Sequence, residues 1–191
     1  MIDTAGCRWL VPPIDSILVS PYPGSNFSYL PQYPKAGTNV QFTDQSKAGI
    51  KWTWDFGDNK GTSTNKNPVY SYAKSGIYFV KEIVDNNGCI DSITKEIIII
   101  EDLVVPNVFT PNNDGINETF TLQAYGITNI DIHIYDRWGL EVYNKIAEKI
   151  FWDGRTNAGL DVPTGTYYYV MKATTIAGVT QSYKGFLEVL R

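Results

Sequence analysis

The side chains that could do chemistry are few, and their spacing does not form a catalytic pattern. The single histidine, His133, alternates with Ile132 and Ile134, so we expect it on the polar face of a strand. The sequence has no paired histidine ligands, no Cys-x-x-Cys, no nucleophile elbow and no glycine-rich phosphate loop. The acidic residues fall at expected turns and not in the cleft pattern of a glycosidase carboxylate pair. We therefore predict no catalytic residue and no enzymatic activity for this chain.

One stretch has the composition of a metal site. Asn112, Asp114, Asn117 and Glu118 place oxygen ligands around Gly115, which resembles a calcium loop. The stretch holds only two carboxylates, however, and its spacing misses the EF-hand pattern. Asn-Asp-Gly is also a common turn sequence, so a hydrogen-bonded turn is the favoured alternative. The sequence indicates no other cofactor.

The two cysteines, Cys7 and Cys89, do not form a disulfide scaffold. Each ends an Asp-x-x-Gly-Cys sequence, and the two copies are 82 residues apart (89 − 7), about one Ig-like module. The match is either a module repeat or chance. In a repeat, the cysteines hold equivalent positions in neighbouring modules, too far apart to bond. We therefore expect Cys89 to be a free thiol.

Composition and charge exclude several partners. The 191 residues carry a formal net charge of −4 and no run of Lys or Arg, so nucleic acid is not an expected partner. No apolar stretch reaches the roughly 18 residues of a transmembrane helix, so we predict no transmembrane segment. Residues 1–4 lack the features of a signal peptide, so an export signal would lie upstream of them.

The elements that must position these side chains are short strands. No apolar stripe of helical period occurs, and Gly, Pro and Asn recur about every ten residues. Val40 and Phe42 alternate with polar residues, and Lys51–Phe56 places three aromatic side chains on one face. Ile130 to Ile134 alternates in the same way. The pattern predicts an all-β protein of tandem Ig-like antiparallel β-sandwiches, with about seven strands in the last one.

We place the domain boundaries where a β-branched strand ends and a new module opens. Residues 1–22 are interpreted as the remnant of a preceding Ig-like repeat. Residues 23–101 form a first complete β-sandwich, and residues 102–191 form a second one that begins after Glu101-Asp102.

The first complete module resembles the PKD family. Residues 52–58 read Trp-Thr-Trp-Asp-Phe-Gly-Asp, and Asn67-Pro68, Tyr70, Tyr72 and the segment 76–80 follow in the family order. The resemblance implies an Ig-like spacer, with one departure at residues 59–61. The alternating aromatics also suit a sandwich core, which we favour over a sugar-binding platform. The motif residues are expected to be mainly structural: Trp52, Trp54, Asp55, Gly57 and Asp58.

The second module resembles the gliding-motility-associated C-terminal domain, the type B sorting domain of the Bacteroidota type IX secretion system. The motifs run in order from residue 105 to Lys184-Gly185 and cover residues 104–191. Several of them read as turns, such as Asp-Arg-Trp-Gly. The motif residues expected to be mainly structural are Pro111, Asn112, Asp114, Gly115, Asn117, Asp136, Arg137, Trp138, Gly139, Trp152, Asp153, Gly154, Pro163, Gly165 and Tyr167.

This resemblance implies a secretion-targeting and surface-localisation region of a large cell-surface adhesin, used in gliding motility by one interpretation. The expected location is the bacterial cell surface, reached through the periplasm and outer membrane. The implied partners are the outer-membrane shuttle β-barrel and an accessory outer-membrane barrel. We expect recognition through the last strand, by edge addition. Its residues are Tyr183, Lys184, Gly185, Phe186, Leu187, Glu188, Val189, Leu190 and Arg191.

The alternative function is a carbohydrate-binding and spacer tail on a secreted polysaccharide-degrading enzyme. It requires an exposed aromatic row, for which Tyr167 and Tyr169 are the candidates, and a glycan as partner. The identity of the cargo upstream is open in either case.

Overall fold

The computed structural model describes residues 9–10, 18–19 and 21–191, and among these it contains strands and turns but no helix. The all-β prediction is confirmed. The chain divides into two compact units, residues 1–100 and residues 101–191. Most of the predicted remnant, including Cys7, lies outside the described residues. Within it, β1 (Trp9–Leu10) pairs antiparallel with β2 (Leu18–Val19). No described helix is long and apolar enough to cross a membrane.

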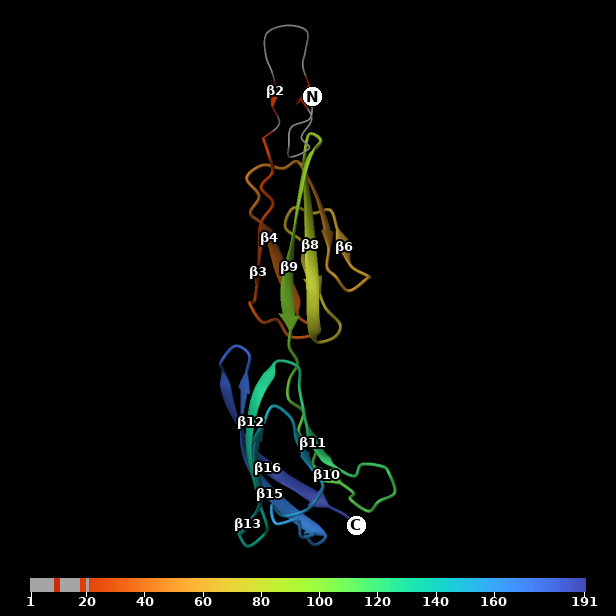
Figure 1. Cartoon of the computed structure of the whole chain (residues 1–191), viewed down its shortest axis with the longest axis vertical. Coiled ribbons are helices and arrows are strands. Elements are labelled where there is room, and N and C mark those ends of the chain that lie inside the picture. Colours follow the sequence, from red (N-terminus) through yellow and green to blue (C-terminus); the bar gives the residue numbers. More distant parts are fainter. Residues whose placement is uncertain (1–8, 11–17, 20) are drawn as a thin grey trace. The chain divides into compact units, whose positions relative to one another are not determined.

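Besides the β1–β2 pair, the described residues of the first unit form two antiparallel sheets (Figure 1). One sheet has the strand order β3-β4-β7 and the other has the order β6-β5-β8-β9. The strands are β3 (Phe27–Leu30), β4 (Asn39–Asp44), β5 (Lys51–Asp55), β6 (Thr62–Ser63), β7 (Val69–Ser71), β8 (Gly76–Asn86) and β9 (Cys89–Ile99).

An aromatic core fills this sandwich. Trp54 and Phe56 are buried as the alternation predicted, whereas Trp52 is only half-buried. Phe27 packs edge-on against Trp54 at 5.1 Å between ring centroids, and Phe56 stacks on Tyr70 at 4.1 Å. Each buried ring contributes roughly 1.5–3 kcal/mol. The first PKD-like motif is therefore a core strand.

The turn after β5 is held by its two aspartates. Asp55 Oδ1 accepts the Gly57 N–H at 2.9 Å, and Asp58 Oδ1 accepts the N–H groups of Lys60 and Gly61. Gly57 has φ 78°, and a Cβ atom there would lie 2.5 Å from the Phe79 carbonyl oxygen. The predicted turn therefore needs glycine for two reasons, its φ angle and the approach of β8.

The cysteine prediction is wrong. Cys89 is fully buried and disulfide-bonded, so it is not a free thiol. The spacing of two five-residue matches says how far apart residues lie in sequence, and it does not determine the distance between their side chains. Disulfides are typical of proteins that mature in oxidising compartments outside the cytoplasm.

The second unit contains seven described strands, as predicted. Its large sheet has the order β10-β16-β15-β12-β13, and β11 pairs with β14 in a small second sheet. All pairs are antiparallel except β10–β16. The strands are β10 (Val108–Phe109), β11 (Phe120–Leu122), β12 (Ile127–Tyr135), β13 (Glu141–Ala147), β14 (Ile150–Trp152), β15 (Gly165–Thr175) and β16 (Thr180–Val189).

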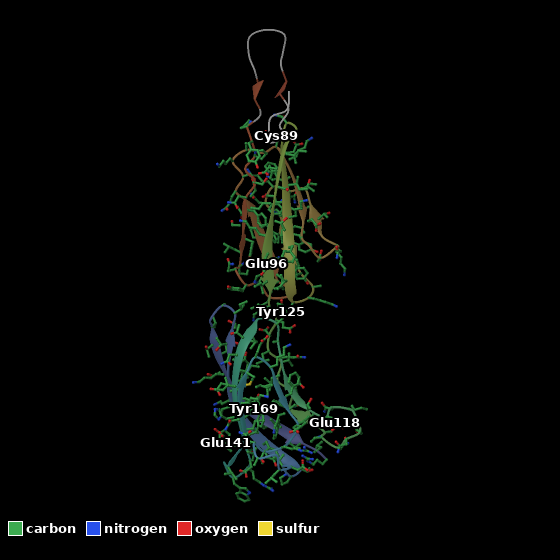
Figure 2. All side chains as sticks on the ribbon, viewed as in Figure 1. Cys89, Glu96, Glu118, Tyr125, Glu141 and Tyr169 are labelled. Carbon is green, nitrogen blue, oxygen red and sulfur yellow. The ribbon has the colours of Figure 1, made fainter. Side chains whose placement is uncertain are left out.

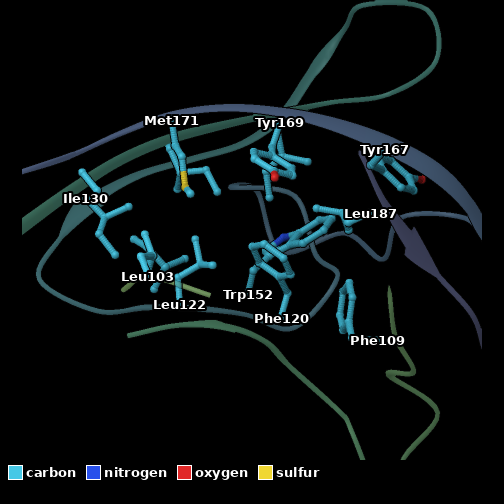
Figure 3. Packing of buried hydrophobic residues seen from close by; sticks show 14 of the residues in the cluster. Leu103, Phe109, Phe120, Leu122, Ile130, Trp152, Tyr167, Tyr169, Met171 and Leu187 are labelled. Carbon is cyan, nitrogen blue, oxygen red and sulfur yellow. The ribbon is translucent and has the colours of Figure 1, made fainter. Parts of the chain in front are cut away.

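The core of the second unit lies between these two sheets. Ile130, Ile132 and Ile134 are fully buried, which confirms the predicted face of β12. Figure 3 shows side chains of β15 pointing toward Phe120 and Trp152 of the small sheet. The buried face of the large sheet is therefore occupied, and its loops and outer face carry the exposed groups.

Candidate recognition site

The predicted recognition strand, β16, lies inside the large sheet. It pairs with β15 along its length, and β10 covers its other edge at Glu188 and Val189. The Glu188 N–H donates to Asn107 O and the Leu190 N–H donates to Phe109 O. The last residues of the strand are therefore not an open edge.

The earlier part of β16 has a different environment. Among the described residues no strand pairs with the β10 side of residues 180–187. Along a strand, the N–H and C=O groups of successive residues point to opposite edges. The backbone groups of Glu188 point toward β10, so the backbone groups of Ser182, Lys184 and Phe186 point to the same edge. Edge addition, as predicted for the terminal strand, is geometrically available only to this part of it.

Arg191 is anchored to the body of the unit. Its guanidinium donates to the carbonyl oxygens of Val162 and Gly154 at 3.2 and 2.9 Å, and it lies 3.2 Å from Asp161 Oδ1. Arg155 also contacts Asp161, at 3.1 Å. The hydrogen bond from Arg155 and the charge of Arg191 lower the pKa of Asp161. Arg191 thus holds the end of the last strand against two loops.

The calcium-like loop is closed by its own hydrogen bonds. The two carboxylate oxygens of Glu118 accept the N–H groups of Asn113 and Gly115 at 3.0 and 2.9 Å. Asp114 Oδ1 accepts the Ile116 N–H at 2.8 Å, and this bond lowers the pKa of Asp114. Figure 2 marks Glu118 at the loop between β10 and β11. These oxygens already serve the turn, so the geometry supports the turn interpretation.

The hairpin between β12 and β13 separates its motif residues by role. Asp136 Oδ1 accepts the N–H groups of Trp138 and Leu140 at 2.8 and 2.9 Å, and Gly139 has φ 83°. Asp136 and Gly139 therefore form the predicted turn. The Trp138 side chain is 83% exposed and contributes nothing to the core. The expectation that it is structural does not fit this position.

The remaining motif turns do support the core. Trp152 is buried, and its indole N–H donates to Arg155 O at 2.6 Å. Asp153 Oδ1 accepts the Arg155 N–H at 3.1 Å, and Gly154 has φ 78°. This turn follows β14, whose pairing partner is β11, so it does not form a hairpin between consecutive strands. Pro163 O accepts the Tyr167 hydroxyl at 2.8 Å, just before β15.

The aromatic row proposed for glycan stacking is wrong. Tyr167 and Tyr169 are 5% and 8% exposed and lie in the core (Figure 3). Tyr168 is 51% exposed on the outer face, opposite the equally exposed Phe186 of β16. Strand alternation puts neighbouring residues on opposite faces, so once one tyrosine is buried the next must be exposed. The sequence carried this signal, but not which of the two faces would be buried.

His133 lies on the polar face of β12, as predicted. Its Nδ1 atom is 2.7 Å from Glu141 Oε2 and its Nε2 atom is 3.3 Å from Asp131 Oδ1. Hydrogen bonds from Asn144 and His133 lower the pKa of Glu141. Among the described residues no group of three His, Cys, Asp or Glu side chains is placed to hold a metal ion, and the contacts of His133 form a surface network.

Family comparisons match both units. Residues 103–189 match the family model of the CHU_C type IX secretion signal domain, and residues 31–99 match that of the PKD domain. Neither matched domain is a catalytic type. The secretion signal match indicates export to the cell surface or the extracellular space and interaction with the type IX machinery.

Each individual relative matches only part of this chain. Collagenase ColA of Clostridium perfringens is 41% identical over 66 residues, which are 33% of this chain and 6% of the collagenase. The PKD1 domain of Vibrio cholerae metalloprotease PrtV is 28% identical with a TM-score of 0.36, covering 41% of this chain and 96% of that domain. A carbohydrate-binding module structure of the β-sandwich superfamily is 22% identical with a TM-score of 0.43, covering 81% of this chain and 58% of its own. Structural likeness this weak does not bear on function.

Proposed function

We propose that this chain targets a large cell-surface adhesin for export and holds it at the surface. The basis is its PKD domain, residues 31–99, followed by its CHU_C type IX secretion signal domain, residues 103–189. The observation that carries the proposal is the match of nearly the whole second unit, residues 103–189, to the secretion signal model. That unit has its own buried core and a complete sheet. The translocon therefore meets a folded surface.

The partners in this proposal are the outer-membrane shuttle β-barrel and an accessory outer-membrane barrel. The first unit acts as a spacer: its aromatic side chains are mostly used in its own core. The disulfide at Cys89 fits passage through an oxidising compartment. Use of the adhesin in gliding motility is the finer form of the proposal.

A secretion assay tests the function. The chain would be fused behind a signal peptide and a fluorescent reporter in a Bacteroidota host, with and without its type IX translocon. We expect surface or extracellular reporter only in the strain with the translocon. Reporter retained in the periplasm of both strains, with the chain intact by immunoblot, would contradict the proposal.

The alternative function, a glycan-binding spacer tail, lost the two tyrosines first assigned to it. Tyr168 and Phe186 are the exposed aromatic pair on the outer face and take their place in that hypothesis. Glycan-array binding by the chain, abolished by Tyr168→Ala and retained by Tyr22→Ala, would support it. Tyr22 is a matched control, because its side chain is 50% exposed in the other unit.

A further inference from the structure

Trp138 is the most exposed large apolar side chain of the described residues, at 83%. The turn that carries it is formed by Asp136 and Gly139 and needs no indole. Exposure of so large an apolar surface on a tight turn opposes the hydrophobic effect without any gain to the fold. The indole is therefore available to a partner outside the chain, and the surface around it decides whether a site exists.

A cleft of about 500 Å³ opens beside Trp138. One wall is the β12–β13 turn, and the other is the loop of residues 156–165. Leu160, which is 68% exposed, lies on the second wall, and Tyr168, 51% exposed, also lines the cleft. Three large side chains from three separate segments thus converge on one concave surface.

Both walls are ordered before any partner binds. In the loop wall, Thr156 N–H donates to Leu160 O and Gly159 N–H donates to Thr156 O, each at 2.8 Å. The Arg155–Asp161 ion pair closes the base of the same loop at 3.1 Å. A preformed surface loses less conformational entropy on binding than a flexible one.

The acidic side chains of the cleft already have partners within the chain, whereas its arginine has no carboxylate partner in the described part of the chain. Asp136 is engaged by its own turn, and Asp161 is engaged by Arg155 and Arg191. Arg137 lies 5.7 Å from the Trp138 ring, and among the described residues no carboxylate lies within ion-pair distance of it. The cleft therefore presents apolar surface and a guanidinium, while its own acids are occupied.

We propose that this cleft is the docking site for a protein of the type IX machinery that presents an apolar pocket to Trp138 and a carboxylate to Arg137. The inference rests on the proposed secretion function and moves the recognition site from the last strand to the loop end of the unit. Trp, Tyr and Arg are the side chains that most often dominate protein interfaces. A glycan is disfavoured because sugar hydroxyls need acceptors as well as donors, and the two carboxylates of the cleft are engaged.

The test compares matched variants of the full 191-residue chain in the secretion assay. Trp138→Ala and Leu160→Ser, one on each wall, are each expected to lower the surface reporter about tenfold or more, the scale of an interface hot spot. Ile146→Ser is the control, because its side chain is 67% exposed on β13 and does not line the cleft. Thermal unfolding of the purified variants checks that the fold is retained.

A competition measurement separates docking from folding. Excess unmutated chain in the periplasm, without reporter, should slow export of the reporter fusion, and Trp138→Ala chain should not. Normal export of Trp138→Ala would overturn this inference and leave the secretion function in place. Failure of the unmutated fusion to leave the periplasm would overturn both. Normal export together with glycan-array binding that needs Trp138 would assign the cleft to a sugar instead.

Discussion

At the scale of single residues, a buried carboxyl group is the feature of the first unit that its strand pattern least explains. Glu82 occupies a core position of β8 between Val80 and Val84 and is 0% exposed. Neither of its carboxylate oxygens accepts a hydrogen bond from a described donor, whereas a protonated Glu82 can donate to the Asp44 carboxylate. Burial, with the neighbouring Asp44 carboxylate, raises the pKa of Glu82 to about 8, although Lys95 opposes the shift. The folded unit therefore favours the protonated acid.

This residue predicts a pH-dependent stability. The folded state keeps the proton up to about pH 8, whereas the unfolded chain loses it near 4.5. The contribution of Glu82 is therefore full below pH 4.5 and is lost as pH rises toward 8, by at most about 1.4 kcal/mol per pH unit. Urea unfolding of the first unit from pH 5 to 9 measures the slope.

Glu82→Gln, which cannot ionise, should remove most of that slope and unfold at higher urea than the unmutated chain at pH 9. The control is Glu96→Gln, an exposed carboxyl on β9. An unchanged slope in Glu82→Gln would show that other groups set the pH dependence.

At the scale of elements, some strand edges lack a pairing strand and are partly covered by side chains or by a short strand. β9 is an edge strand eleven residues long, a form that invites pairing with other chains. The Tyr29 hydroxyl of β3 donates to Glu96 O of β9 at 3.3 Å, and the Lys95 ammonium of β9 donates to Phe27 O of β3, so side chains of both strands link β3 to that edge. In the second unit the short β10 covers the end of β16. Residues 180–187 of β16 have no described strand paired on the β10 side and form an unpaired edge of this unit.

The loop between β10 and β11 leads to a prediction about calcium and the stability of the second unit. Because Glu118 and Asp114 oxygens accept backbone N–H groups, we expect EDTA to leave the thermal unfolding of the second unit unchanged. Glu118→Ala should lower the free energy of unfolding by about 1 kcal/mol with or without calcium, through loss of two hydrogen bonds. A melting temperature that rises with added calcium, and no longer rises in Glu118→Ala, would instead establish a calcium site.

At the scale of the whole molecule, the chain holds two separate hydrophobic cores. One consists of residues up to Ile99 and the other begins at Leu103, with no residue in common. Each unit therefore has the means to fold as a domain. In the proposed function the first unit is the spacer and the second is the signal.

Two separate cores predict two separate responses to mutation. Trp54→Ala should destabilise the first unit by about 3–5 kcal/mol and Trp152→Ala the second by a similar amount, because both indoles are buried. Calorimetry should show each variant lowering a different transition. If both variants lowered the same single transition equally, the units would be one cooperative structure.

The sequence by itself determined the fold class, the faces of β5 and β12, and the aspartate-glycine turns. These depend on local rules: strand period, side-chain polarity and the φ angles that glycine allows. Long motif blocks also determined the order of a PKD and a secretion signal domain. Each of these properties depends on residues that lie close together in the sequence.

Only the tertiary structure decided the burial of Tyr167 and Tyr169, the disulfide state of Cys89 and the exposure of Trp138. It also placed Arg191 against Val162 and Gly154. Alternation says that two faces differ, but which face is covered depends on the sheet packed against it. Likewise, a motif residue is structural or available to a partner according to contacts made by distant segments. These contacts are properties of the folded chain, and no local pattern encodes them.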